Sequence, residues 1–145
     1  MGTQELTDIQ ALINIFFPFA EELLIKYGEF LPYAGATTTA GDFVSVGRHD
    51  ENEDLDTNKA ISNLKHALHM ANSQYLVVAV FYEAVTKDSE TGKTSDAIAV
   101  YIEHKDGETG YEFFYPYRVE DKENFIVEDS FGNAVTKQVF SLGIL

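Results

Sequence analysis

The stretch that decides the fold runs from Tyr75 to Tyr117 and contains three strand-like segments. The first reads Tyr75-Leu-Val-Val-Ala-Val-Phe-Tyr82, a nearly unbroken run of β-branched and aromatic residues. The second reads Ser95-Asp-Ala-Ile-Ala-Val-Tyr-Ile-Glu-His104, and the third reads Tyr111-Glu-Phe-Phe-Tyr-Pro-Tyr117. The segments between them, residues 87–93 and 105–110, both contain Asp and Gly, which favour turns. The stretch therefore predicts an antiparallel meander.

Before the meander, apolar residues recur at helical spacing from about residue 7 to Tyr27. Thr7 or Asp8 can cap the start of this helix, and Gly28 suits its C-terminal end. Pro18 interrupts the pattern, because it lacks an amide hydrogen and disfavours helical geometry at the residue before it. We expect a kink there, with about two turns of helix on either side.

A β-hairpin and a second helix are predicted next. Strand-like residues 29–39 and 43–48 flank the small turn Ala40-Gly-Asp42, and Pro32 should lie where the hairpin starts. An acidic loop, residues 49–56, then leads into a helix from about Asp56 to Ser73. One face of that helix is apolar and consists of Ala60, Ile61, Leu64, Ala67, Leu68 and Ala71.

After the meander, residues 120–124 predict a turn, residues 125–129 a fourth strand of the set, and residues 131–133 another turn. Residues 135–140 are apolar enough to pack back onto the body. The order of elements is α-β-β-α-β-β-β-β, which indicates a single α+β domain over residues 1–145. We expect an antiparallel sheet of five or six strands with both helices on one face.

Composition narrows the classes of partner. The chain has 145 residues, 45% of them hydrophobic, and a formal net charge of -14. Such an acidic surface repels phosphate groups, so nucleic acid and membrane surfaces are excluded as partners, whereas a basic protein remains suitable. The chain has no cysteine, which excludes disulfides and thiolate metal sites. The N-terminus lacks the pattern of a secretion signal, so we expect a cytoplasmic protein.

Three motifs suggest ligands but do not satisfy their patterns. Thr91-Gly-Lys-Thr94 matches the end of a phosphate-binding P-loop, but Lys87 stands where the first glycine is required. His66 and His69 are three residues apart on a helix without further metal-ligating partners at a known spacing. The acidic loop lacks the central glycine and distal glutamate of a calcium-binding loop. The sequence therefore predicts no metal and no cofactor.

Strand alternation separates the polar residues of the second segment of the meander. Asp96 and His104 fall on one face, and Tyr101 and Glu103 on the other. Asp96 and His104 lie about 26 Å apart along the strand, so the two side chains do not form a dyad.

The meander is also rich in aromatic residues. In the third segment Tyr111, Phe113, Tyr115 and Tyr117 share one face. If both helices cover the other face of the sheet, these rings are exposed and indicate a partner or a second copy of the chain. The alternative is that a helix or the C-terminal segment covers them.

The chain resembles a group of small bacterial α+β proteins, and the resemblance extends over most of its length. The segments that carry it are Lys26-Tyr-Gly-Glu-Phe-Leu-Pro-Tyr-Ala-Gly35, Ser95-Asp-Ala-Ile98, Glu103-His104 with Gly107 or Gly110, and Tyr115-Pro-Tyr117. The resemblance implies a single acidic domain, similar in kind to immunity proteins or accessory binding proteins. It transfers no functional residues.

The sequence favours a non-enzymatic binding module that acts on a protein partner or a second copy of itself, for example as an immunity-like protein against a basic toxin. The alternative is a small-ligand-binding protein or enzyme with a pocket between helix and sheet. A flat, exposed aromatic patch would favour the first function, and a pocket with converging polar groups the second. The candidate binding residues are Tyr101, Tyr111, Phe113, Tyr115, Tyr117, Asp96, Glu103 and His104.

Overall fold

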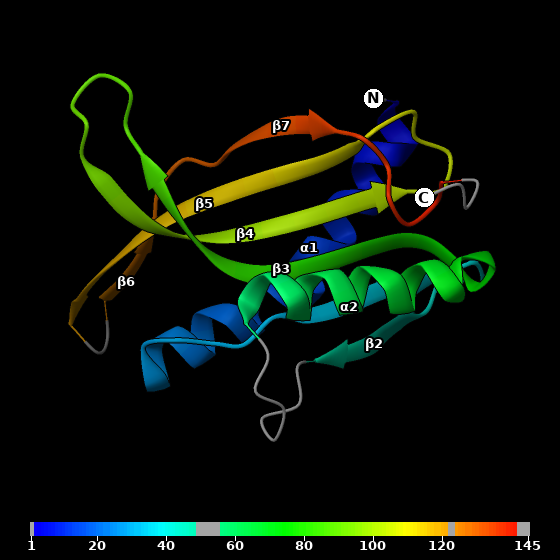
Figure 1. Ribbon diagram of the computed structural model, residues 1–145, viewed down its shortest axis with the longest axis horizontal. Helices are drawn as coiled ribbons and strands as arrows, with labels where there is room; N and C mark the ends of the chain where they lie inside the picture. Colours follow the sequence, from blue (N-terminus) through cyan, green and yellow to red (C-terminus); the bar gives the residue numbers. More distant parts are fainter. Residues whose placement is uncertain (1, 49–55, 122–123, 142–145) are drawn as a thin grey trace.

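The computed structural model describes residues 2–48, 56–121 and 124–141, which form two helices packed against a curled antiparallel sheet (Figure 1). The strand order is β2-β1-β3-β4-β5-β6, and β7 also pairs with β5. The predicted α+β class and order of elements are confirmed, and β7 adds one strand. The elements are α1 (Thr3–Tyr27), β1 (Tyr33–Thr38), β2 (Phe43–Arg48), α2 (Thr57–Met70), the 3₁₀ turn η1 (Asn72–Gln74), β3 (Tyr75–Lys87), β4 (Thr94–His104), β5 (Gly110–Asp121), β6 (Asn124–Val127) and β7 (Phe131–Val135).

The predicted meander forms the centre of the sheet. Strand β3 pairs with β4 from Val77 opposite His104 to Lys87 opposite Thr94, and β4 pairs in turn with β5. The β3–β4 loop closes with a hydrogen bond from the Asp88 amide to the Lys93 carbonyl, and Gly92 takes a left-handed conformation with φ of 73°. The Thr91–Thr94 motif therefore lies in a hairpin loop between two strands, where a P-loop has a helix after its loop.

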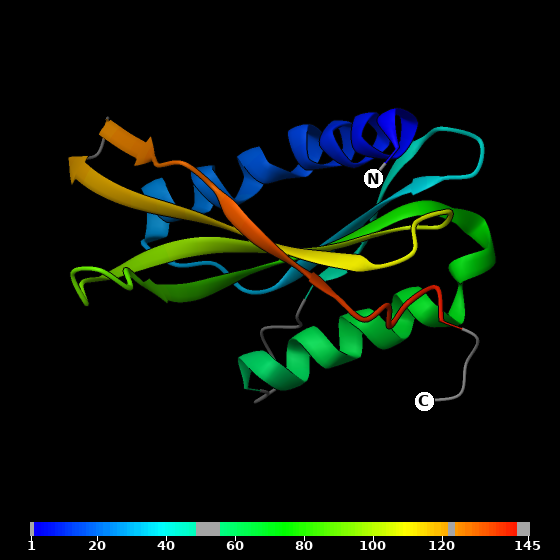
Figure 2. The same ribbon diagram turned by 90° about the horizontal axis from the view of Figure 1, so that it is seen from above.

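The two helices lie on opposite faces of the sheet, so the expectation that they share one face is wrong (Figure 2). Helix α1 packs on the face that carries Phe81 and Val100, and α2 packs on the face that carries Val80 and Tyr101. The physical reason lies in β3 itself. Its central side chains are apolar on both faces, and the residues from Val77 to Phe81 are fully buried, so both faces need a cover.

Helix α1 is one continuous helix through Pro18, and it begins at Thr3 rather than at residue 7 or 8. The hydroxyl of Tyr33, from β1, contacts the backbone on both sides of the proline. It donates a hydrogen bond to the Phe16 carbonyl at 2.7 Å and accepts one from the Ala20 amide at 3.1 Å. This side chain satisfies backbone groups where a proline weakens the regular pattern. Gly28 ends the helix in a left-handed conformation, as predicted.

Helix α2 begins as predicted, because the Asp56 side chain accepts a hydrogen bond from the Lys59 amide at 2.7 Å. It ends at Met70, before the expected Ser73, and the chain continues through η1 into β3. The rest of the predicted acidic loop, residues 49–55, lies outside the described residues.

The C-terminal part of the chain differs from the prediction. Residues 131–133, predicted as a turn, form the start of β7, where Phe113 lies opposite Gly132 in the register with β5. The glycine allows this pairing, because a Cβ atom at that position would lie 2.4 Å from the Phe113 ring. Within the described residues, neither helix is long and apolar enough to cross a membrane.

Candidate functional site

An acidic patch lies on the α1 face, near the end of the sheet that carries the β3–β4 loop (left in Figure 1). Side chains on this face form rows across the strands. Toward the loop the rows change from apolar to acidic: Glu83 is paired with Ile98, and Val85 is paired with Asp96. Tyr117 of β5 lies close enough to both acids for their charges to act on it. We define Glu83, Val85, Asp96 and Tyr117 as the acidic patch.

The negative charges of the acidic patch act on one another. Burial raises the pKa of the Glu83 carboxyl, and the charges of Glu29 and Asp96 raise it further, although a hydrogen bond from the Phe30 amide opposes this. Burial also raises the pKa of Tyr117 to about 12, with further contributions from Asp96 and Glu83. The local potential is therefore negative.

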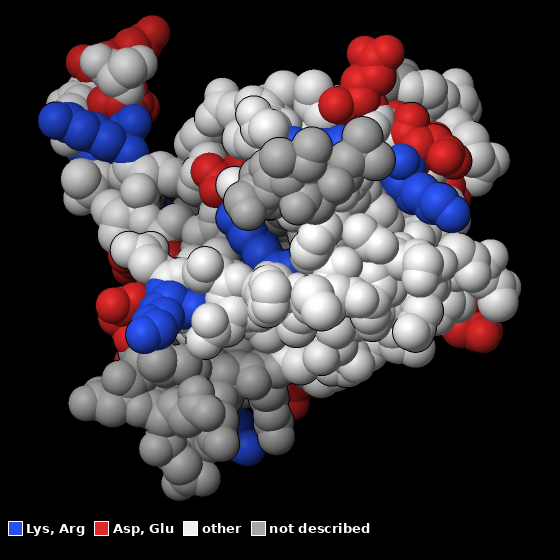
Figure 3. All heavy atoms as spheres, turned by 45° about the vertical axis from the view of Figure 1, so that its right-hand side comes forward, with Lys and Arg blue, Asp and Glu red and all other residues white. Residues whose placement is uncertain are grey.

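Within the described part of the chain, no lysine or arginine nitrogen lies within 4.0 Å of a carboxylate oxygen of this patch. The ion pairs that arginine forms there join Arg118 to Glu120 and Glu128, and no lysine is found in an ion pair. The view in Figure 3 looks onto a different side of the molecule, where basic and acidic side chains are both present around a broad uncharged area.

The predicted aromatic face is not bare, because α1 partly covers it. The Tyr115 ring makes an edge contact with Phe17 of α1 at 4.8 Å between centroids, and Tyr117 stacks on Phe125 at 5.0 Å. Tyr111 and Phe113 stack on each other at 5.8 Å. All four predicted rings of β5 are half-buried against the core of the α1 face. Strand β5 therefore does not present a flat, exposed aromatic patch.

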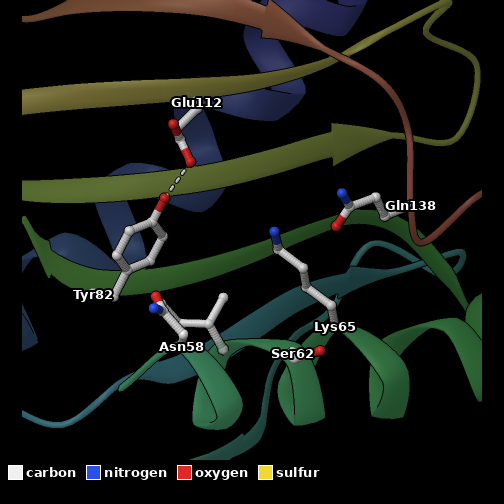
Figure 4. A pocket seen from close by; sticks show the side chains of 7 residues that line it. Asn58, Ser62, Lys65, Tyr82, Glu112 and Gln138 are labelled. Carbon is white, nitrogen blue, oxygen red and sulfur yellow. Dashed lines mark hydrogen bonds between the residues drawn. The ribbon is translucent and has the colours of Figure 1, made fainter. Parts of the chain in front are cut away.

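A polar cavity of about 270 Å³ lies on the other face, between α2 and the sheet. Its side chains come from α2, from two strands and from the C-terminal segment, and converge on one space (Figure 4). The lining residues are Asn58, Ile61, Ser62, Lys65, Tyr82, Glu112 and Gln138. A pocket between helix and sheet is what the alternative prediction from the sequence, a small-ligand-binding protein or enzyme, requires.

Opposite charges face this polar cavity. The Lys65 ammonium lies 3.9 Å from the centre of the Tyr101 ring, close enough for a cation–π interaction. Burial lowers the pKa of Lys65, and the charges of Glu112 and Glu103 act in the opposite direction. The Tyr82 hydroxyl donates a hydrogen bond to the Glu112 carboxylate. Burial and then this hydrogen bond raise the pKa of Tyr82, so the phenol stays a donor.

Glu103 is fully buried below the cavity and holds the C-terminal segment in place. Its carboxylate accepts hydrogen bonds from the amides of Gln138, Val139 and Phe140 at 2.8–3.0 Å. It also accepts one from the Tyr101 hydroxyl. A buried carboxylate is stable when its oxygens are satisfied in this way. The predicted residues Tyr101 and Glu103 thus contact each other, and both lie beneath the surface.

The predicted residue His104 is also buried and joins α1 to the sheet. Its Nδ1 accepts a hydrogen bond from the Asp106 amide at 3.0 Å, so Nε2 carries the proton that it donates to Asp8 at 2.9 Å. His69 binds the Val139 carbonyl through Nδ1 at 2.8 Å, together with Asn72, and His66 is exposed. Within the described ranges, no three His, Asp or Glu side chains are grouped closely enough to hold a metal ion.

The predicted binding residues therefore do not form one site. Asp96 and Tyr117 lie together in the acidic patch, whereas Glu103 and His104 make structural hydrogen bonds on opposite faces of the sheet. Sequence reasoning missed Glu83, Lys65, Tyr82, Glu112 and Gln138. Strand alternation in residues 75–87 gives a signal for Glu83, because the side chain interrupts the apolar run, but no spacing in the sequence brings the other four together.

No protein-family model, curated protein or solved structure matches the chain. The resemblance to small bacterial α+β proteins consequently stays a prediction, and function has to be argued from the geometry.

Proposed function

We propose that the protein is a non-enzymatic binding protein that takes up a basic segment of a partner protein at the acidic patch. The observation that carries this proposal is the group of Glu83, Asp96 and Tyr117, whose two carboxylates form an ion pair with no internal cation within the described residues. A lysine or arginine of a partner would supply that cation.

The chemistry of the patch suits arginine in particular. Two carboxylates can accept the parallel N–H donors of a guanidinium group, and a tyrosine ring nearby offers a surface for stacking. Val85, 68% exposed, adds an apolar contact beside the acids. The net charge of -14 would speed the approach of a basic protein, which an immunity-like role against a basic toxin requires.

Quantitative affinity capture from the source cell tests this function. The bait is the wild-type chain or a double variant, Glu83→Gln with Asp96→Asn, that removes two charges of the acidic patch. We expect a protein with a basic surface to be enriched by the wild type and lost by the variant. Rising salt should also release the partner, because exposed charge pairs are screened over about 10 Å at 0.1 M.

The matched control is Asp106→Asn with Glu108→Gln, which removes two exposed charges from the β4–β5 loop at the other end of these strands. It should retain the partner. Equal capture by the patch variant would show that the patch is not the binding site. A chain that stays monomeric in native mass spectrometry and enriches no protein would contradict the function itself.

The alternative, a small-ligand-binding protein, is supported by two different observations: α1 partly covers the aromatic rings of β5, and polar groups converge on the cavity beneath α2. By the criterion drawn from the sequence these two observations favour the alternative, whereas the acidic patch, which the sequence did not define, favours the binding protein. That cavity is independent of the acidic patch, since the two lie on opposite faces of the sheet.

A further inference from the structure

The polar cavity contains one cation and one anion that do not neutralise each other by direct contact. Lys65 extends from α2 into the space between Gln138 and the Tyr82–Glu112 pair (Figure 4). Among the described residues, no carboxylate oxygen lies within 4.0 Å of its ammonium nitrogen. Lys65 as a whole is half-buried, and its ammonium lies over the Tyr101 ring instead.

Glu112, the anion of the cavity, has one carboxylate oxygen without a hydrogen-bond donor among the described residues. One of its carboxylate oxygens accepts the Tyr82 hydroxyl, and no hydrogen bond to the other oxygen is found within the part of the chain that the structure describes. The residue is half-buried at the wall of the cavity. A donor brought by a ligand would find an oriented acceptor.

We propose that the polar cavity binds a small zwitterion of the free amino acid class, with its carboxylate toward Lys65 and its ammonium toward Glu112. A simple anion would have to approach Glu112 as well as Lys65, and a simple amine would have to approach Lys65 as well as Glu112. Only a molecule that carries both charges is attracted by both walls.

The size and the remaining lining agree with a ligand of this class. The volume of about 270 Å³ is slightly below the usual range for drug-sized ligands, which begins at about 300 Å³, so the occupant is small. Ser62, Asn58 and Gln138 offer hydroxyl and amide groups that suit a polar ligand side chain. Ile61 is the apolar exception in the lining.

Ligand-observed NMR and calorimetry with a panel of free amino acids at millimolar concentration test the proposal. Acetate and ethylamine serve as the probes that carry a single charge. We expect at least one amino acid to bind more tightly than either single-charge probe. The variants Lys65→Met and Glu112→Gln should each weaken the binding of that amino acid by about tenfold or more, because each variant loses one charge-assisted contact.

Two control variants carry the same chemical changes outside the cavity. Lys59→Met lies on the same helix and is exposed, and Glu108→Gln lies in the β4–β5 loop. Both should bind like the wild type, and circular dichroism should show that all four variants are folded. Acetate binding that Glu112→Gln strengthens, with no preference for amino acids, would show an anion site and overturn the proposal. Binding of no probe, or equal weakening by the controls, would also overturn it.

Discussion

The two faces of the sheet differ in what they bury. The α1 face joins large apolar and aromatic side chains from the helix and from three neighbouring strands, such as Phe16, Phe81 and Val100. The α2 face has small residues at Ala34 and Ala36 and, beside its apolar core, the polar groups of Tyr101, Glu103, Lys65 and Glu112. The comparison teaches that one sheet can use tight apolar packing on one face, and on the other both satisfied polar groups such as Glu103 and polar groups that face a cavity. Room for a ligand exists on the polar face.

The largest expected effect comes from removing the buried carboxylate of the polar face. Glu103→Ala leaves the amides of residues 138–140 and the Tyr101 hydroxyl without their acceptor. The free energy of unfolding in urea should fall by about 3–5 kcal/mol, since each buried unpaired donor is costly. The exposed control Glu108→Ala should change it by less than about 0.5 kcal/mol. A loss below about 1 kcal/mol for Glu103→Ala would show that polar anchoring does not stabilise this face.

A smaller effect is expected from overfilling the apolar face. A Cβ atom at Gly35 would lie 2.6 Å from the ring of Phe16, so Gly35→Ala forces that ring to move. Chemical denaturation should show a loss of about 1–3 kcal/mol. The second change Phe16→Leu removes the obstructing ring, and in that background Gly35→Ala should cost clearly less. Equal costs in both backgrounds would mean that packing against Phe16 is not the cause.

The smallest effect is expected at Glu83, which belongs to the acidic patch on the α1 face. Its pKa is higher in the folded chain than its ordinary value of 4.5, so the folded state holds the proton more tightly than the unfolded state. The charged carboxylate therefore lowers stability above the folded pKa, and this penalty is lost as pH falls to 4.5 and below.

Glu83→Gln should consequently raise the free energy of unfolding at pH 7, by less than about 0.5 kcal/mol because solvent screens the half-exposed side chain. The glutamine oxygen can still accept the Phe30 amide. Urea titrations at pH 7 and at about pH 4 should show the gain at the higher pH alone. A gain of the same size at both values would contradict the electrostatic origin.

Much of the fold follows from the sequence, because the deciding signals are local. The meander, the start of α2 near Asp56, the glycine cap at Gly28 and the two faces of β4 all derive from patterns within about ten residues. The prediction that both helices share one face was wrong, although the apolar run from Tyr75 to Tyr82 already contained the relevant signal. A strand that is apolar on both faces needs a layer on each of them.

The candidate sites are less predictable for a physical reason. Lys65, Tyr82, Glu112 and Gln138 come from four separate parts of the chain, and their approach depends on which face α2 covers. Asp96 was predicted as a binding residue, but its partner Glu83 becomes a neighbour only through the register of β3 with β4. Alternation assigns a side chain to a face, whereas register decides which side chains are adjacent.

The hydroxyl of Tyr33 has a consequence for how the molecule opens. The Ala20 amide of α1 is hydrogen-bonded to a side chain of β1, so the centre of the helix and the first hairpin share a bond. In hydrogen exchange, protection of that amide reports the integrity of a strand 13 residues away in sequence as well as that of its own helix. We therefore expect the helix and the hairpin to open together, although Pro18 removes one backbone donor from the helix.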